Sequence, residues 1–551
     1  MATKDDVLDQ FGILNIQPND QVIDKCLRMC EKYKISAEDI ADQWFAYKSS
    51  NPSLKGDQPT IDHLEYLERT VFGKTRDHEE SDIISHGHGS GRFSAQESQP
   101  VKTPSKTTSL SEANSNSINV KSTPSTTYVD RKDALSICCS FGMKPDKLEK
   151  SAFIDLKIKS LNDELKNLKL YQLYKWTLNG AEEVFQIVVS GIARKHELKL
   201  TNSQLFSGKI NERFLTGQIL VDNIDGEQII KLELPRYPYN GDTIELTLSE
   251  MQKYSLFPGQ TVIVEGSLNA PFQTWMTEKI YSDSIINFPV EPPIKKDGIH
   301  IIVACGPFTI KDNLLFDPLN DLLHYIKKHK PDVVLLTGPF YDNNNEAVEN
   351  DELQQSCDAF FLDLIDNLMR EVGETHVIIV PSMKEPHQFP VFPTPPYRTD
   401  QKYENLSFMN DPCMVDINGL VIGISTADIL FDLGRSEVNV DKVNNGPKDR
   451  IGRLASHVLR QQNFYPLNPV GNEVIVNPRL MPQYGILQIK PHILVLPSTL
   501  RFFIKEIDEC LVINPERLTK GYAGGTFASI NILPGNEQSI CGRTACQILR
   551  I

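Results

Sequence analysis

Several features that would place this protein in a familiar class are missing from its sequence. No stretch approaches 18 apolar residues, and the opening MATKDDVLDQF has no apolar core of the kind that a secretion signal contains. We therefore expect the chain neither to span a membrane nor to be secreted. None of the ten cysteines belongs to a CxxC pair with a second pair downstream, which favours reduced thiols in a nuclear or cytosolic protein over zinc sites or disulfides.

A basic segment is also missing. The formal net charge is −15 at pH 7, and the isoelectric point is about 5.4. Proteins whose main task is to bind nucleic acid usually carry a basic domain or stripe, because phosphates dominate that interaction. We therefore expect any contact with DNA or RNA to be weak or indirect.

The sequence does contain enough apolar residues for folded cores, with 40% hydrophobic and 8% aromatic content over 551 residues. This length predicts about three folded units. In residues 1–75, apolar residues recur at helical spacing in NDQVIDKCLRMCEKY and again, from Thr60 onwards, in TIDHLEYLERTVF. We predict a small all-α domain over 1–75 that carries no catalytic pattern and docks a partner.

Residues 76–152 differ in composition. Between residues 81 and 130 there are 18 Ser or Thr and only two aromatics, which is too little apolar surface to offset the entropy of ordering. We predict a disordered linker here. Thr103 and Thr123 each precede a proline, and Lys106 stands where proline-directed kinases favour a basic residue. Both threonines are candidate phosphorylation sites, where a phosphate would alter the docking of a flexible arm.

Residues 153–290 are predicted to form a helical lead-in, up to about residue 180, followed by a small β-barrel. Short β-branched segments such as VFQIVVSGIAR (184–194), RFLTGQILVDN and TVIVEGSLN are typical of strands separated by turns. Five or six of them in about a hundred residues favour an OB-fold. OB-folds often bind single strands through basic grooves, but residues 184–290 hold nine Lys or Arg against twelve Asp or Glu. That balance favours contact with protein.

Residues 291–551 alternate between strand and helix patterns, as α/β domains do. Buried-strand patterns such as IHIIVAC and DVVLLTG are interspersed with helical patterns such as DPLNDLLHYIKKH. The pair Asn418-Gly419 predicts a tight hairpin, so part of the sheet is antiparallel. We expect a layered sheet with helices on its faces.

The loops after five of these strands stand where two-metal phosphoesterases hold their ligands. Such enzymes place carboxylates and histidines around two ions about 3.5–4 Å apart, in the order DxH, GDxxD, GNH with Glu or Asp, a lone His, and GHxH. Here only Gly338 and Asp342 survive, and a lysine and an arginine stand in loops that should hold cations. We predict no metal, no cofactor and no catalysis. The altered positions are Cys305, Pro307, Pro339, Ser382, Met383, Pro497, Pro515 and Arg517.

Four histidines are candidates to rebuild a metal site, and we predict structural roles for all of them. His300, His376 and His492 stand at the starts of predicted strands, at the opposite edge from the altered loops. His387 lies nearer those loops but, apart from Glu385, has no companion carboxylate or histidine at metal spacing. A lone histidine of this kind is usually a hydrogen-bonded structural residue.

Several motifs together closely resemble the B-subunit family of DNA polymerase α–primase. They include LLTGPF, VPSMKEPHQFPVFPTPPY, DPCMVDINGLVIGISTADILFDLG and NPERLTKGYAGGTFASI. The resemblance covers the barrel and α/β regions by motif, whereas the helical domain and linker match by layout. It implies an OB-fold followed, in residues 291–551, by a calcineurin-like phosphoesterase fold that is inactive.

The resemblance also implies a nuclear, non-catalytic scaffold subunit that supports the initiation of DNA replication. The barrel and phosphoesterase-like domains would bind the zinc-bearing C-terminal domain of the polymerase α catalytic subunit, and primase would join through the complex. The N-terminal domain would dock other replisome proteins. Three alternatives are a B subunit of polymerase δ or ε, an active metal-dependent phosphodiesterase, and a single-strand DNA-binding protein. NPERLTKGYAGGTFASI favours polymerase α, and Pro339 in place of a bridging aspartate argues against the enzyme.

Overall fold

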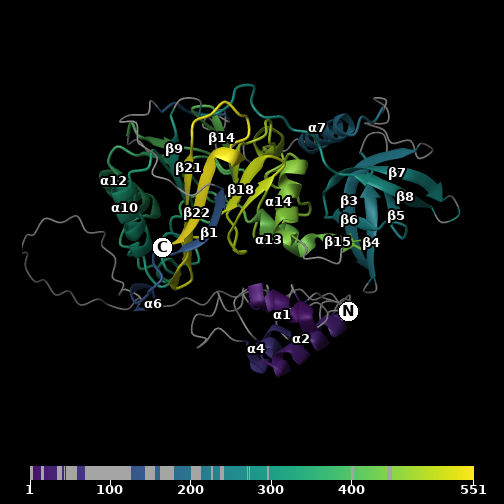
Figure 1. Cartoon of the computed structure of the whole chain (residues 1–551), viewed down its shortest axis with the longest axis horizontal. Helices are drawn as coiled ribbons and strands as arrows, with labels where there is room; N and C mark the ends of the chain where they lie inside the picture. Colours follow the sequence, from purple (N-terminus) through teal and green to yellow (C-terminus); the bar gives the residue numbers. More distant parts are fainter. Residues whose placement is uncertain are drawn as a thin grey trace, which may run out of the picture. The chain divides into compact units, whose positions relative to one another are not determined.

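The computed structural model of the chain separates into two compact units, Met1–Asn119 and Val120–Ile551 (Figure 1). The structure describes residues 4–13, 18–33, 37, 40–41, 44, 59–68, 126–142, 156–161, 179–199, 213–224, 227–235, 241–269, 271, 273–294, 297–398, 403–443 and 449–551. The candidate phosphorylation sites Thr103 and Thr123 lie outside these residues.

The first unit contains helices α1 (Lys4–Ile13), α2 (Asp20–Tyr33) and α4 (Ile61–Leu67). The predicted apolar face of α2 is buried, with Val22 and Cys26 fully enclosed. Thr60 caps α4 as predicted, since its hydroxyl accepts a hydrogen bond from His63 N–H at 3.4 Å. The described part of residues 1–75 is therefore helical around one apolar core, as the sequence predicts.

The second unit is built around two packed β-sheets. The first has the order β1 (Ile137–Gly142), β22 (Thr544–Arg550), β21 (Thr526–Ile532), β9 (Ile299–Cys305), β10 (Val333–Thr337), β11 (His376–Val380) and β12 (Leu406–Phe408). The second has the order β17 (Phe503–Ile507), β18 (Cys510–Asn514), β16 (Ile493–Val495), β14 (Leu420–Ile424), β13 (Cys413–Ile417) and β2 (Ile158–Ser160). We call the two sheets with their helices the α/β body.

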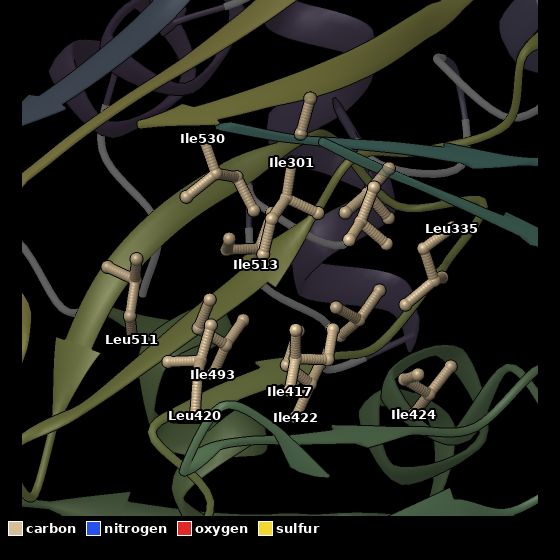
Figure 2. Close-up of a cluster of buried hydrophobic side chains, with 14 of the residues drawn as sticks. Ile301, Leu335, Ile417, Leu420, Ile422, Ile424, Ile493, Leu511, Ile513 and Ile530 are labelled. Carbon is tan, nitrogen blue, oxygen red and sulfur yellow. The ribbon is translucent and has the colours of Figure 1, made fainter. Parts of the chain in front are cut away.

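Branched aliphatic side chains from both sheets fill the space between them (Figure 2). Ile301 and Leu335 of the first sheet face Ile422 and Ile513 of the second, and all four are fully buried. Helices α10 (Asp317–His329) and α12 (Cys357–Val372) cover the outer face of the first sheet, and α13 (Ile429–Ser436) and α14 (Arg450–Arg460) cover that of the second (Figure 1). The result is a four-layer body with mixed sheets.

Shorter elements complete the α/β body. The hairpin between β13 and β14 turns at Asn418-Gly419, as predicted, with positive φ at both residues. The remaining elements are α6 (Thr126–Val129), α11 (Glu346–Glu349), β19 (Thr519–Lys520), β20 (Ala523–Gly524), the π-helix η4 (Met481–Gly485) and the 3₁₀ helix η5 (Cys541–Arg543).

The five-stranded barrel predicted from the sequence is present as a closed barrel. Its strands lie in the order β3 (Phe214–Ile224), β4 (Glu227–Glu233), β5 (Thr243–Thr247), β8 (Thr274–Tyr281) and β7 (Thr261–Asn269). A separate strand, β6 (Lys253–Leu256), leaves the barrel and pairs antiparallel with β15 (Val438–Asp441) of the α/β body. The barrel is thereby joined to the body by main-chain hydrogen bonds.

Three sequence-based predictions are wrong at this level. VFQIVVSGIAR is not a strand but part of helix α7 (Asn179–Lys195), because Phe185, Val188, Val189 and Ile192 bury one helical face and tertiary packing overrides β-propensity. Ile158–Ser160, predicted within a helical lead-in, is strand β2, paired with β13.

The third error concerns the predicted linker 76–152. Its described residues 126–142 hold α6 and β1, and β1 pairs antiparallel with β22 at the edge of the first sheet. The Ser/Thr-rich composition is confined to residues 81–130, and the predicted linker extends too far, over the six strand residues of ICCSFG. Both sheets of the α/β body are therefore completed by chain that precedes the barrel.

Candidate functional site: the strand-end loops and the joint with the barrel

The carboxyl ends of parallel strands from both sheets meet at one edge of the α/β body. β9, β10 and β11 run parallel in the first sheet, as do β14, β16 and β18 in the second. Hydrogen bonds connect the loops that follow: Leu518 N–H donates to Cys305 O at 2.6 Å, and Thr519 Oγ1 donates to Pro307 O at 2.9 Å. This edge is where α/β folds place their chemistry.

The structure brings the first two altered loops into close contact. Gly306 and Pro339 approach so closely that a Cβ on Gly306 would lie 1.8 Å from Pro339 O. Cys305 is fully buried, and burial raises the pKa of its thiol to about 11. A thiol in this state is neither a nucleophile nor a ready metal ligand.

The other altered positions have local structural roles. Ser382 Oγ accepts a hydrogen bond from Lys384 N–H at 3.3 Å, and Met383 packs into the apolar cluster between the second sheet and α13 and α14. Pro497 and Pro515 are buried, and Pro515 O accepts a hydrogen bond from Thr526 Oγ1 at 2.6 Å. Met383 is therefore part of an apolar core, whereas Cys305, Pro307 and Pro339 take part in the contacts between the loops.

A buried carboxyl group that sequence reasoning passed over lies behind the second and third loops. Glu385 is 3% exposed, and its Oε1 accepts hydrogen bonds from Phe340 N–H at 2.6 Å and from Tyr397 O–H at 2.5 Å. Burial raises the pKa of Glu385 to about 8, so the group is protonated near neutral pH. Gly338 survives for a packing reason, because a Cβ there would meet Glu385 Oε1 at 2.7 Å.

A second buried carboxyl group, Asp411, lies near the guanidinium group of Arg517. Asp411 accepts hydrogen bonds from the N–H group of Thr426 at 2.8 Å and from the Thr426 hydroxyl. Burial raises its pKa to about 7, and the nearby positive charge of Arg517 opposes that rise. Arg517 Nη2 lies 3.5 Å from Thr426 O, and Nη1 is buried without a hydrogen-bond partner among the described residues.

No sequence signal marked these two carboxyl groups. Asp411 stands before a proline at the start of a strand pattern, and Glu385 lies within a loop already judged to lack ligands. Across the residues that the structure describes, no group of three or more His, Cys, Asp or Glu side chains is arranged to hold a metal ion. A guanidinium group and two carboxyls with raised pKa values lie at the edge where the parallel strands of the two sheets end.

The four histidines have the structural surroundings that we predicted. His300 pairs with Ser529 Oγ at 2.9 Å, and His376 pairs with Ser407 Oγ at 2.9 Å. His492 accepts a hydrogen bond from Val421 N–H at 3.0 Å. His387 stacks among Tyr341, Phe361 and Tyr397, and burial lowers its pKa to about 4.

A second polar cluster lies where the barrel meets the α/β body. Glu437 follows α13, and its side chain is 3% exposed. It accepts hydrogen bonds from Ser255 Oγ of β6, from Arg453 Nε at 2.8 Å and Nη2 at 2.9 Å, and pairs with His457 Nε2 at 3.0 Å. Burial alone would raise the pKa of Glu437, but the bonds from His457, Arg453 and Ser255 hold it at about 2.

This cluster forms one wall of a groove of about 910 Å³ between the barrel and the α/β body. One side is lined by Tyr254 and Leu256 of β6, and the other by the polar face of α14, including Arg453 and Arg460. Charged residues of both signs line the groove, so it has no strong preference for an anion or a cation.

Comparison with known proteins identifies the family. The model for the B subunit of DNA polymerase alpha/epsilon matches residues 301–505, and models for the N-terminal and OB domains of the DNA polymerase alpha B subunit match residues 5–74 and 182–283. The chain is 32% identical to the DNA polymerase alpha B subunit of Mus musculus over 441 residues, covering 75% of this chain and 71% of the mouse protein. The chain belongs to the B-subunit family of DNA polymerase alpha.

Other members of the family match over similar spans. The Schizosaccharomyces pombe protein is 29% identical over 429 residues, covering 73% of this chain and 72% of that protein, and the Rattus norvegicus protein is 36% identical over 335 residues, covering 57% and 54%. Two of the three matching models are specific to polymerase alpha, so the δ and ε alternatives are not favoured. The barrel of this family member is an OB domain, as predicted.

Proposed function

We propose that the chain is the non-catalytic scaffold subunit of DNA polymerase alpha–primase, and that its α/β body is a calcineurin-like phosphoesterase fold without activity. The observation that carries the second part is the state of the strand-end loops. Arg517 lies near Asp411 at the strand-end edge, and burial raises the pKa of Glu385 and Asp411 to about 8 and about 7. Carboxyl groups with pKa values raised in this way are poor anionic ligands for the two divalent ions of such an enzyme, and the guanidinium beside Asp411 opposes the binding of a cation.

The proposed division of the chain is a docking domain over 1–75, a linker from 76 that ends before residue 126, an OB domain that ends near 290, and the phosphoesterase-like body over 291–551. Residues 126–142 and 156–161 belong to the body in this scheme, because β1 and β2 complete its sheets. The barrel is then an insertion in the sequence of the body. This arrangement supports the proposal that the two domains present one continuous surface to a partner.

The proposed partner of this platform is the zinc-bearing C-terminal domain of the polymerase alpha catalytic subunit, with primase joined through the complex. The OB domain is proposed to contact nucleic acid only weakly, because most of its described cations already have carboxylate partners. Lys231 lies 2.7 Å from Asp222, and Arg213 lies 2.5 Å from Glu265. Neutralised cations contribute little to phosphate binding.

The proposed location is the nucleus, where DNA is replicated. Among the described helices, none is both long and apolar enough to cross a membrane. The N-terminal domain is proposed to dock other replisome proteins, with phosphorylation at Thr103 or Thr123 modulating that contact. Each phosphate adds about −2 charge to a segment already rich in polar residues.

Co-purification tests the proposal. The full chain is expressed with and without the C-terminal domain of a polymerase alpha catalytic subunit, and the products are separated by size-exclusion chromatography. Each fraction is assayed for manganese-dependent phosphodiesterase activity, with an active two-metal phosphodiesterase as the positive control and chelator as the negative control. We expect a stable 1:1 complex and no hydrolysis above background.

Two results would contradict the proposal separately. Absence of a complex would remove the scaffold role while leaving the inactive fold intact. Hydrolysis that follows the protein peak and stops with chelator would mean that the altered loops still bind metal. Tight binding of single-stranded DNA by the isolated chain at physiological salt would favour the OB-domain alternative.

A further inference from the structure

The barrel and the α/β body are joined by buried polar contacts for which the proposed function gives no reason. Gln461, directly after α14, is 2% exposed. Its Oε1 accepts a hydrogen bond from Thr261 N–H at 2.8 Å, and its Nε2 donates to Thr261 O at 3.1 Å and to Ser282 O at 2.7 Å. Thr261 begins β7, and Ser282 follows β8. One side-chain amide of the body therefore binds the main chain at both ends of the barrel's β7–β8 hairpin.

Gln462 makes a second set of contacts with the same region. Its Nε2 donates to Ser284 Oγ at 2.7 Å and to Ile285 O at 2.9 Å, and the residue is 6% exposed. The backbone of Gln462 has a φ of 49°, a left-handed conformation that costs a non-glycine residue about 1 kcal/mol. The bonds from its side chain and from its neighbours hold it there.

Helix α7 closes the same junction from a third side. A Cβ on Gly191 would lie 2.8 Å from Gln462 Nε2 and 2.9 Å from Ser284 Cβ, so α7 approaches this closely only because Gly191 has no side chain. Ser284 N–H also donates to Arg460 O at 3.0 Å. We call Gly191, Ser284, Gln461 and Gln462 the junction.

The segment that leads from β8 of the barrel to the α/β body is held by contacts at several of its residues. The Phe288 ring stacks on His492 with a centroid distance of 5.0 Å, and Lys490 Nζ lies 4.6 Å from the centre of the same ring. Arg543 Nη2 donates to Pro293 O at 2.8 Å, and Lys490 N–H donates to Asn287 O at 2.8 Å. A connector fixed at each of these points cannot act as a hinge.

The pairing of β6 with β15 attaches the barrel at a second place, where Ser255 meets the Glu437 cluster. The junction and this ribbon contact α14 at different places: Gln461 and Gln462 follow its last residue, whereas Glu437 and Ser255 of the ribbon contact Arg453 and His457 within the helix. Two attachments along one helix fix an angle, whereas one would leave a pivot.

We propose that Gln461 and Gln462 set the orientation of the OB barrel relative to the α/β body, and so determine the shape of the surface offered to a partner. The consequence for a partner rests on the proposed function, but the orientation itself does not. Buried amides suit this task because their bonds are directional: a small rotation of the barrel breaks several of them at once.

The test measures the orientation in the full chain alone. Spin labels are attached through bioorthogonal residues at two exposed positions, Glu278 in the barrel and Lys328 in the body, which leaves the native cysteines unmodified. The variant Gln461→Met keeps the side-chain length and loses all three hydrogen bonds. The matched control is Asn345→Leu, a 2% exposed amide whose Nδ2 makes three hydrogen bonds entirely within the body.

We expect one narrow distance distribution in the unmodified chain and in Asn345→Leu, and a broadened distribution in Gln461→Met. An unchanged distribution in Gln461→Met, or equal broadening in both variants, would overturn the proposal. If Gln461→Met does not fold, Gly191→Ala provides a second test, because alanine favours the helix while its Cβ displaces Gln462. The same broadening is expected, and an unchanged distribution there would overturn the proposal as well.

Partner binding is measured separately on the same proteins. If the binding-competent orientation falls to about one tenth of the population, affinity for the catalytic C-terminal domain falls about tenfold. Absence of binding by the unmodified chain would contradict the proposed function, while the distance distributions would still decide the role of the junction.

Discussion

The strand-end loops and the joint between barrel and body bury the same chemical group with opposite results. Glu385 in the loops and Glu437 at the joint are each almost fully enclosed. Burial raises the pKa of Glu385 to about 8, because the groups that bond to it are an N–H and a hydroxyl, which carry no charge. The pKa of Glu437 is held at about 2, because Arg453 and His457 contact it directly.

The opposite pKa shifts of Glu385 and Glu437 reflect whether a cation contacts the buried carboxyl group. A carboxyl that ionises inside a protein needs a paired cation, and the joint supplies one as part of the fold. In the described strand-end loops, the guanidinium of Arg517 acts on Asp411, whereas the hydrogen bonds of Glu385 come from neutral donors. The joint therefore has the properties of a permanent charged contact, and the loops have those of a packed, largely neutral interior.

The largest expected effect is at the joint. Glu437→Gln removes the negative charge of a side chain that is only 3% exposed and ends its ion pair with Arg453. Breaking a buried pair by removing one partner costs about 3–5 kcal/mol. Urea unfolding of the full chain at pH 7, followed by circular dichroism, measures the loss. The matched control is Glu265→Gln in the barrel, where Arg213 is largely exposed and loses less. Equal losses in the two variants would contradict the comparison.

Acid should reproduce this effect in the unmodified chain. The pKa of Glu437 falls from 4.5 to about 2 on folding, so its contribution is fully present above pH 4.5 and is lost as the pH falls towards 2. Glu437→Gln should therefore reduce the dependence of the free energy of unfolding on pH over that interval.

A smaller contribution to the free energy of unfolding, with the opposite dependence on pH, is expected for Glu385. Its pKa rises from 4.5 to about 8 on folding, so between these values the unfolded chain has lost a proton that the folded chain keeps, and stability falls as the pH rises. Glu385→Gln removes this term. The stability advantage of the unmodified chain over the variant should shrink by about 3–4 kcal/mol between pH 5 and pH 8. Asp411 is present in both proteins and cancels. An advantage that grows with pH would mean that Glu385 is ionised.

Much of this architecture follows from sequence patterns that act over short distances. DVVLLTG and IHIIVAC are buried strands because uninterrupted branched residues suit a sheet covered on both faces, and Asn418-Gly419 turns because both residues tolerate positive φ. Thr60 caps its helix for an equally local reason. The residue types at Pro307 and Pro339 can also be read directly from the sequence, because both positions lie at short offsets from predicted strands.

What could not be predicted depends on contacts between residues far apart in the chain. β1 is a six-residue segment that pairs with β22 about 400 residues later in the chain, and so short a segment gives no indication of such a distant partner. Helix α7 contains β-branched residues that favour a strand. Only its packing against the barrel shows that its apolar residues are buried at helical spacing and not in alternation, as in a strand. Glu385, Glu437 and Gln461 are ordinary polar residues in sequence, and their burial is set entirely by the assembled layers.

The smallest expected effect distinguishes the two cations that the sequence places in the altered loops. Lys384 follows β11, yet its side chain is 40% exposed and pairs with Glu473, which is 78% exposed, at 2.7 Å. An exposed pair of this kind contributes little, so Lys384→Ala should change the free energy of unfolding by no more than about 0.5 kcal/mol. Arg517→Met, measured in the same way, should cost about 1–3 kcal/mol, because it removes the hydrogen bond from Nη2 to Thr426 O and the positive charge that acts on Asp411. If Lys384→Ala were as costly as Arg517→Met, both cations would stabilise the strand-end edge. We expect instead that Arg517, which follows β18 of the second sheet, has this role, and that Lys384 does not.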